Sequence, residues 1–205
     1  DDYGVTLYDV PVGFKYIGEK IKQYDDTGKG KFLFGFEESC GYLRGTHCRD
    51  KDAVVASMLF AEMVCYYTYH NKGVYERLCE LYDKYGYVYD YTDCKMYGGL
   101  NAMSDMSAVV EKIRETKISG LGGVKVNAVR DYLSLKRTDS DGEAESIDCS
   151  SCNAVYFELA GGGFVCVRPS GTEPKLKVYY SLPAENKEKA ETLLSAVKAD
   201  FDKLA

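Results

Sequence analysis

The second half of this sequence is organised around the stretch Arg168-Pro169-Ser170-Gly171-Thr172-Glu173-Pro174-Lys175-Leu176-Lys177. Apolar, alternating runs flank it at Val155 to Val167 and at Val178 to Leu182, so the pattern predicts a turn between two strands. Gly171 allows the backbone to bend so that its amides converge, and the planar guanidinium of Arg168 suits phosphate oxygens. The stretch therefore indicates an anion cradle; the alternative is an ordinary hairpin turn.

Other side chains of this stretch extend the same set of donors. Ser170 and Thr172 add hydroxyl groups. Lys175 and Lys177 alternate with Leu176, so on a strand both ammonium groups face one side.

The bulk composition limits the class of protein. The chain has 205 residues, which suits one large or two ordinary domains, and 45% hydrophobic with 28% charged residues is typical of globular proteins. The formal net charge of -6 argues against a nucleic-acid or anionic-membrane partner. No apolar run approaches the ~20 residues needed to span a bilayer, and no signal peptide is recognisable. The sequence therefore predicts a soluble cytoplasmic protein.

The eight cysteines are scattered along the chain. Only Cys149 and Cys152 have a metal-like spacing, and His47 and His70 lie far from them in the sequence. Because structural zinc usually takes four protein ligands, the spacing predicts free thiols and no metal site.

The first half alternates strand and helix patterns. In order, these are a strand over Tyr3–Val10, a helix from Phe14, a strand over Lys31–Phe36 and a strongly apolar helix over Ala53–Tyr69. Asp50 or Asp52 can cap the last helix. The pattern predicts an α/β domain with a mixed or parallel sheet.

The second half mixes longer strands with three further helices. The expected elements are a helix over 73–85, strands over Tyr87–Tyr97 and Val124–Leu135, a helix over Asn101–Lys117, a polar loop over Lys136–Ser151 and a final helix over Ala184–Leu204. This half therefore predicts an α+β domain with an antiparallel sheet, divided from the first half near residues 73–88.

Polar residues follow the second predicted strand. Glu37, Glu38 and Ser39 stand at a strand end, where open α/β sheets place their ligands. A carboxylate and a hydroxyl two residues apart can both contact vicinal hydroxyls of a sugar; the alternative is a solvated acidic loop. Sequence neighbours rarely flank a substrate from opposite sides, so an acid/base pair is disfavoured.

Basic residues add candidate contacts. Arg49 and Lys51 precede a helix, and Lys15 begins one, so each can contact an anion or sugar; the alternative for each is a solvated surface charge. His47 lies between the acidic and basic groups and can assist them. No Ser-His-Asp order, P-loop or acidic cluster for Mg²⁺ is recognisable, so no catalytic residue is predicted.

Four stretches resemble, in this order, the C-terminal part of the α-D-phosphohexomutase family, which includes phosphoglucomutases and phosphomannomutases. They are Val12-Gly13-Phe14-Lys15-Tyr16-Ile17, Gly35-Phe36-Glu37-Glu38-Ser39-Cys40-Gly41-Tyr42, Asp50-Lys51-Asp52-Ala53-Val54 and Arg168-Pro169-Ser170-Gly171-Thr172-Glu173-Pro174-Lys175. The resemblance implies that residues 1–85 form most of domain three of that family. Residues 86–205 would form domain four, with a fold similar to the TATA-binding-protein type.

The resemblance also implies a role for each motif. The expected sugar contacts are Glu37, Ser39 and Lys51. The expected grip on the phosphate that is not transferred is Arg168, Ser170, Gly171, Thr172 and Lys177, with Lys175 as the alternative to Lys177. Lys15 is a possible further contact in the cleft.

The family's phosphoserine loop and Mg²⁺-binding loop belong to its first two domains, which these residues do not include. The resemblance thus implies a parent enzyme that uses Mg²⁺ and a glucose 1,6-bisphosphate intermediate, with a phosphosugar and the N-terminal domains as partners. This chain alone is expected to bind weakly and not to catalyse. The alternatives are phosphomannomutase or phosphopentomutase specificity, a non-catalytic phosphosugar-binding module, and a structural interaction domain. The preferred sugar and the oligomeric state stay open.

Overall fold

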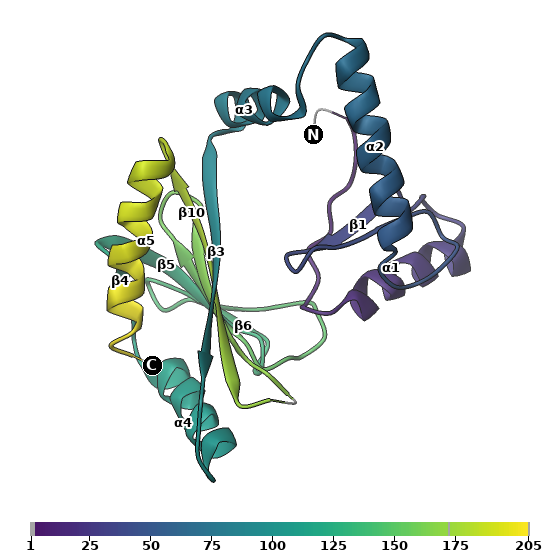
Figure 1. The fold of residues 1–205 in the computed structure, drawn as a ribbon. Helices are drawn as coiled ribbons and strands as arrows, with labels where there is room; N and C mark the ends of the chain where they lie inside the picture. The colour runs from purple at the N-terminus through teal and green to yellow at the C-terminus, as the bar shows by residue number, and fades with distance from the viewer. Residues whose placement is uncertain (1–2, 172, 205) are drawn as a thin grey trace. The chain divides into compact units, whose positions relative to one another are not determined.

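The structure is a computed structural model that describes residues 3–171 and 173–204. The chain divides into two compact units, residues 1–79 and residues 80–205, and the division falls within helix α3 (Val74–Tyr85). Figure 1 shows the order of the elements in each unit. The domain boundary predicted after residue 85 lies six residues beyond this division and stays a prediction.

The first unit is built from helix α1 and a short β-hairpin, followed by helix α2. The bounds are Phe14–Thr27 for α1, Phe34–Glu37 for β1, Gly41–Arg44 for β2 and Ala53–Tyr69 for α2. Its core is small, and consists of Phe14, Ile21 and Leu43 with Ile17, Phe32 and Cys48 packed against them. The hairpin places its three-residue turn, which carries Ser39, at the surface.

The structure confirms one sequence prediction for this unit and contradicts another. The helix predicted over Ala53–Tyr69 is confirmed, with Asp52 rather than Asp50 as its cap. The strand predicted over Tyr3–Val10 is wrong, because an alternating pattern forms a strand only where a neighbour pairs with it, and these residues pair with none in the described part of the chain. The two strands that do form are joined by a tight turn and are therefore antiparallel.

Helix α2 is largely apolar, and most of its side chains are exposed, with Val55, Ala56 and Leu59 half-buried. None of its 17 residues is buried, and Val54, Met58 and Phe60 are 70%, 66% and 58% exposed. No helix among the described residues is long and apolar enough to cross a membrane.

The second unit is an antiparallel sheet with helices packed on one face. Its strands are β3 (Tyr87–Met96), β4 (Gly120–Leu121), β5 (Val124–Asp131), β6 (Lys136–Asp139), β7 (Ala144–Ser146), β8 (Val155–Leu159), β9 (Phe164–Pro169) and β10 (Lys175–Ala184). The sheet order is β3-β10-β9-β8-β5-β6-β7, with β4 paired to β5. The α+β class predicted for this half is confirmed.

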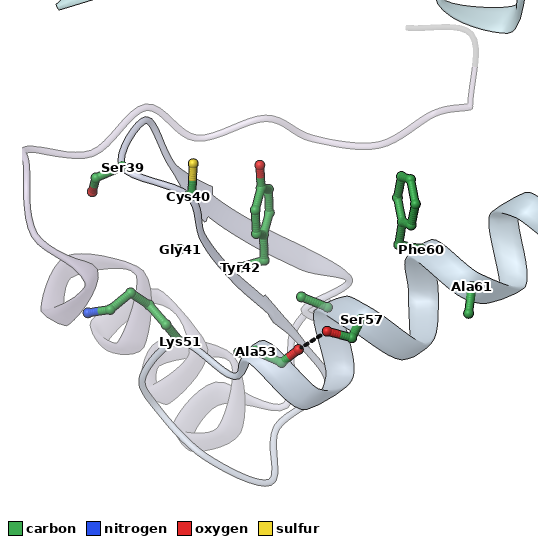
Figure 2. A pocket seen from close by; sticks show the side chains of 10 residues that line it. Ser39, Cys40, Gly41, Tyr42, Lys51, Ala53, Ser57, Phe60 and Ala61 are labelled. Carbon is green, nitrogen blue, oxygen red and sulfur yellow. Dashed lines mark hydrogen bonds between the residues drawn. The ribbon is translucent and has the colours of Figure 1, made fainter. Parts of the chain in front are cut away.

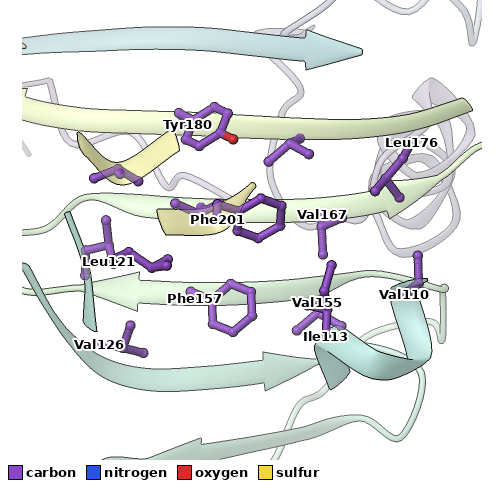
Figure 3. Close-up of a cluster of buried hydrophobic side chains, with 14 of the residues drawn as sticks. Val110, Ile113, Leu121, Val126, Val155, Phe157, Val167, Leu176, Tyr180 and Phe201 are labelled. Carbon is purple, nitrogen blue, oxygen red and sulfur yellow. The ribbon is translucent and has the colours of Figure 1, made fainter. Parts of the chain in front are cut away.

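Helices α4 (Ala102–Glu115) and α5 (Lys187–Phe201) bury one face of this sheet. Figure 3 shows Phe201 of α5 between Tyr180 and Phe157 of the strands, and Val110 and Ile113 of α4 on the side of Val155. Because strand residues alternate between faces, the residues next to these core positions, including Arg168, point away from the helices.

The loop predicted over Lys136–Ser151 is wrong in part, since it contains β6 and β7. The sequences of these outer strands are polar because few of their side chains are buried. Charged side chains hold the strands to the sheet. Arg137 of β6 donates to Glu158 of β8 from Nη2 at 2.8 Å and to Glu145 from Nη1 at 3.0 Å.

Candidate functional site

The acidic loop of the first unit brings together two of its three predicted sugar contacts. Glu37 ends β1, and its side chain is 15% exposed. The Lys51 Nζ lies 3.9 Å from Glu37 Oε1, although fourteen positions separate them in the sequence. Ser39 is exposed at the tip of the hairpin. A carboxylate, an ammonium group and a hydroxyl on one loop can donate to and accept from sugar hydroxyls.

Gly41 makes room for this pair. A Cβ built on Gly41 would lie 2.6 Å from Glu37 Oε1 and would also overlap the aliphatic part of Lys51. Any residue larger than glycine would therefore displace both charged side chains. The glycine could not be singled out from the sequence, where it reads as an ordinary turn residue.

Lys51 is held from two sides. Its Nζ lies 3.1 Å from Asp50 Oδ1 and 5.7 Å from the centroid of the Phe14 ring. The hydrogen bond to Asp50, with smaller contributions from the charges of Asp50 and Glu37, raises the pKa of Lys51, so the ammonium form is favoured. The side chain is a fixed cation beside the Glu37 carboxylate.

A groove runs from this loop along α2. Its volume is about 650 Å³, and Figure 2 shows Ser39 and Lys51 near one end and Phe60 and Ala61 near the other. The walls are Ser39, Cys40, Gly41, Tyr42, Lys51, Ala53, Ala56, Ser57, Phe60 and Ala61. Small side chains on α2 leave the groove open, whereas Tyr42 and Phe60 supply aromatic surface.

The start of α2 fixes the position of Lys51. Asp52 Oδ1 accepts from the backbone N–H groups of Val54 and Val55 at 2.8 and 3.2 Å, and His47 Nε2 lies 2.8 Å from Asp52 Oδ2. The hydrogen bond from His47, followed by those from the backbone, holds the pKa of Asp52 below its usual value. The sequence predicted the cap but not the histidine that supports it.

Lys15 takes a separate position. It lies in the first turn of α1, exposed, with its Nζ 4.8 Å from the centroid of the Tyr16 ring. Its part in a cleft stays a prediction.

The second predicted loop connects β9 and β10 in the second unit. The Ser170 N–H donates to the Lys175 carbonyl at 2.9 Å and closes the turn, while the Glu173 N–H donates to Ser170 Oγ at 3.3 Å. Gly171 is exposed. Thr172 lies outside the described residues, so its predicted hydroxyl contact stays a prediction.

Two cations of this loop region face each other across the strands. Arg168 of β9 pairs directly with Lys177 of β10, so both side chains lie on the same face of the sheet. Within the described ranges neither has a carboxylate within 4.0 Å. By contrast, Lys175 forms an ion pair with Glu173. Like charges placed opposite each other destabilise a sheet, and a bound anion would offset that cost.

Two models of one protein family match this chain, one in each half. Residues 1–85 match the family model described as phosphoglucomutase/phosphomannomutase, alpha/beta/alpha domain III. Residues 108–199 match the model described as phosphoglucomutase/phosphomannomutase, C-terminal domain.

The chain belongs to the phosphoglucomutase/phosphomannomutase family.

Individual members of this phosphoglucomutase/phosphomannomutase family are similar over most of the chain. A phosphoglucomutase of Staphylococcus haemolyticus is 37% identical over 90% of this chain, and one of Staphylococcus aureus strain USA300 is 33% identical over 89%. The open form of pp63/parafusin, a phosphoglucomutase from Paramecium, superimposes with a TM-score of 0.59 over 99% of this chain at 19% identity, which supports the fold. The chain spans 33% of the length of each of these three proteins.

The Mg²⁺ implied by the phosphoglucomutase/phosphomannomutase family does not fit the described residues. Mg²⁺ prefers an octahedral set of oxygen ligands. The one group of three potential ligands found in the described part of the chain, His47, Cys48 and Asp52, includes a thiol and an imidazole. No step involving Mg²⁺ is therefore derived for this chain.

Proposed function

We propose that this chain is the C-terminal part of a phosphoglucomutase-like enzyme, which interconverts a hexose 1-phosphate and its 6-phosphate through a phosphoserine and a bisphosphorylated sugar such as glucose 1,6-bisphosphate. Residues 1–85 would be most of domain three and residues 86–205 domain four. The phosphoserine and the Mg²⁺ ligands would lie in N-terminal domains outside this sequence. The chain itself would bind substrate and not catalyse.

In this proposal each unit supplies one kind of substrate contact. Glu37 and Ser39 accept from and donate to sugar hydroxyls, and Lys51 adds a cationic donor. In the second unit, Arg168 and Lys177 hold the phosphate that is not being transferred, aided by the backbone at Gly171.

The observation that carries the proposal is the cross-strand pair of Arg168 and Lys177. Two cations on one sheet face without an acidic neighbour among the described residues form a site that gains by binding an anion. The planar guanidinium of Arg168 can donate two parallel hydrogen bonds to phosphate oxygens, while Lys177 contributes a point charge. Both groups act here as hydrogen-bond donors, so the pair orients substrate.

The test is a calorimetric titration of this chain with glucose 6-phosphate, and Arg168→Ala beside the wild type. A charge-assisted hydrogen bond contributes about 1.5–3 kcal/mol, so Arg168→Ala should weaken binding roughly tenfold or more. Lys175→Ala is the matched control, because Lys175 lies two residues before Lys177 on β10 and is already paired with Glu173. Equal losses in both variants, or no loss in Arg168→Ala, would contradict the assignment.

Enzyme activity is tested on the longer protein that carries this chain. It should convert glucose 1-phosphate to glucose 6-phosphate, and Arg168→Ala should lower kcat/KM. Phosphosugar binding without conversion by that protein would favour a non-catalytic binding module. A preference for mannose or pentose phosphates in the same assay would assign the alternative specificities.

A further inference from the structure

Three potential metal ligands of different chemistry meet in the loop that leads into α2. The imidazole of His47, the thiol of Cys48 and the carboxylate of Asp52 each offer an atom, and these atoms all lie within 4.8 Å of one another. Cys149 and Cys152, the two cysteines with a metal-like spacing, lie in the second unit and are not part of this cluster. Adjacent His and Cys residues do not match a common metal motif, so the cluster became visible only once the fold placed Asp52 beside them.

The fold holds two of these three ligands in place. Cys48 is partly buried and packs against the core of the first unit, and its Sγ donates to the Asp50 carbonyl at 3.1 Å. Asp52 is fixed through Oδ1, which caps α2, so Oδ2 is left to face His47 at 2.8 Å. His47 itself is exposed and is free to adjust its ring.

We propose that His47 Nε2, Cys48 Sγ and Asp52 Oδ2 bind one borderline-soft divalent cation, with Zn²⁺ the best match, and that water takes the fourth position. Nitrogen, thiolate and carboxylate ligands at about 2.0–2.3 Å are the set that Zn²⁺ takes in proteins. The thiolate and the carboxylate together balance the two positive charges of the ion. The proton that leaves the Cys48 thiol passes to the buffer, and the ion replaces the hydrogen bond to the Asp50 carbonyl.

The surrounding charges allow a cation here. The two basic residues of the loop are both engaged elsewhere, since Arg49 forms an ion pair with Asp25 and donates to the Thr46 carbonyl, and Lys51 is paired with Asp50. The positive end of α2 opposes a cation, and the Asp52 carboxylate lies between that end and the site. Ligand atoms around a tetrahedral ion stand roughly 3.2–3.8 Å apart, so only small movements of His47 and Cys48 are needed.

This site goes beyond the proposed function and does not depend on it. Its consequence for that function is regulatory, because Lys51 lies next to Asp52 in the same loop. An ion bound through Asp52 would fix the loop and set the position of the Lys51 ammonium group. The first unit would then respond to Zn²⁺ through this loop.

The experiment is a titration of the metal-free, reduced chain with Co²⁺, which reports thiolate ligation by a near-ultraviolet charge-transfer band. We expect one Co²⁺ per chain, displaced by one Zn²⁺, with release of a proton. Cys48→Ser should abolish the band, and His47→Gln should weaken Co²⁺ binding at least tenfold. Asp52→Asn should also weaken binding while it keeps the helix cap, since asparagine caps as well as aspartate.

The matched control is the double variant Cys149→Ser, Cys152→Ser, which leaves the loop intact and should retain the band at full strength. Thermal unfolding of each variant verifies that it is folded. If Cys48→Ser does not fold, His47→Gln still decides the test, because His47 is exposed and its replacement leaves the core unchanged. The proposal is overturned if no band forms with millimolar Co²⁺, if the band survives in His47→Gln at unchanged affinity, or if the control variant loses it.

Discussion

Replacing Gly41 with alanine adds one methyl group beside Glu37 and Lys51, and so tests their proposed role in sugar binding. The new Cβ would lie 2.6 Å from Glu37 Oε1, whereas ordinary contact begins at roughly 3.5 Å, so the carboxylate must retreat by about 1 Å. The Lys51 side chain, which also overlaps the new atom, must move with it. Both charged side chains that we propose as sugar contacts in the first unit therefore change position together.

The expected loss falls on binding and not on stability. A misplacement of about 1 Å can cost up to about 100-fold, so we expect glucose 6-phosphate to bind roughly 10–100-fold more weakly, or about 1.4–2.8 kcal/mol. Gly41 lies outside the left-handed region, so alanine suits its backbone. The gain of roughly 0.4–1 kcal/mol from a stiffer unfolded chain offsets the crowding, and the free energy of unfolding should change by less than about 1 kcal/mol.

Heteronuclear NMR titration measures affinity and local response together. In the wild type, glucose 6-phosphate should shift the amide signals of Ser39 and Gly41. Gly73→Ala is the control, because Gly73 lies in the same unit, avoids the left-handed region and would place its Cβ no closer than 3.9 Å to another atom. A folded Gly41→Ala chain that binds within twofold of the wild type would refute the role given to Glu37 and Lys51.

Three further perturbations test separate parts of the structure. Gly122→Ala should destabilise the second unit by about 2–5 kcal/mol. A left-handed φ costs an alanine roughly 1–2 kcal/mol. Overpacking against α5 adds about 1–3 kcal/mol, because the new Cβ would lie 2.5 Å from a backbone nitrogen of that helix. Gly123→Ala, also left-handed but in open space, should cost only the first part, and equal losses in urea unfolding would contradict the packing argument. Asp52→Ala should lower the free energy of unfolding of the first unit by about 0.5–2 kcal/mol, and Asp52→Asn should lower it by almost nothing. Urea unfolding followed by helix content measures both, and a similar loss in the two variants would exclude a capping role. Hydrogen bonds from Arg137 are the main cause that lowers the pKa of Glu158 to about 2, below roughly 4.3 when unfolded, so this stabilisation is present above about pH 4.3 and is lost as the pH falls toward 2. Glu158→Gln should reduce the dependence of the free energy of unfolding on pH in this acid range. An unchanged dependence would mean that other groups cause it.

The sequence predicted most of what depends on local pattern. Helix α2 begins and ends where its apolar run does, because Asp52 caps it and the Asn71–Gly73 segment cannot continue it. The strand alternation around Arg168 likewise predicted that Lys175 and Lys177 share a face. These features follow from spacing within a few residues.

The sequence could not predict what depends on long-range pairing. The residues of Tyr3–Val10 alternate like a strand, yet pairing needs a neighbour that spacing alone does not show. The polar strands β6 and β7 show little apolar alternation, because they are held less by burial than by the ion pairs of Arg137 with Glu158 on β8 and with Glu145 on β7. In the site, the choice of Lys177 over Lys175 as the partner of Arg168, and the clearance that Gly41 gives to Glu37, required the cross-strand register and the side-chain packing.

The exposure of α2 has a consequence for how the first unit opens. A helix with no fully buried residue gains little from packing, so its cap and its contacts with β2 must hold it in place. Its amides should therefore exchange with solvent far faster than those of the buried strands of the second unit, and a protease should cut within α2 before it cuts elsewhere in regular structure. The cutting rate would then measure how much of this surface another part of a longer protein covers, without any need for a substrate.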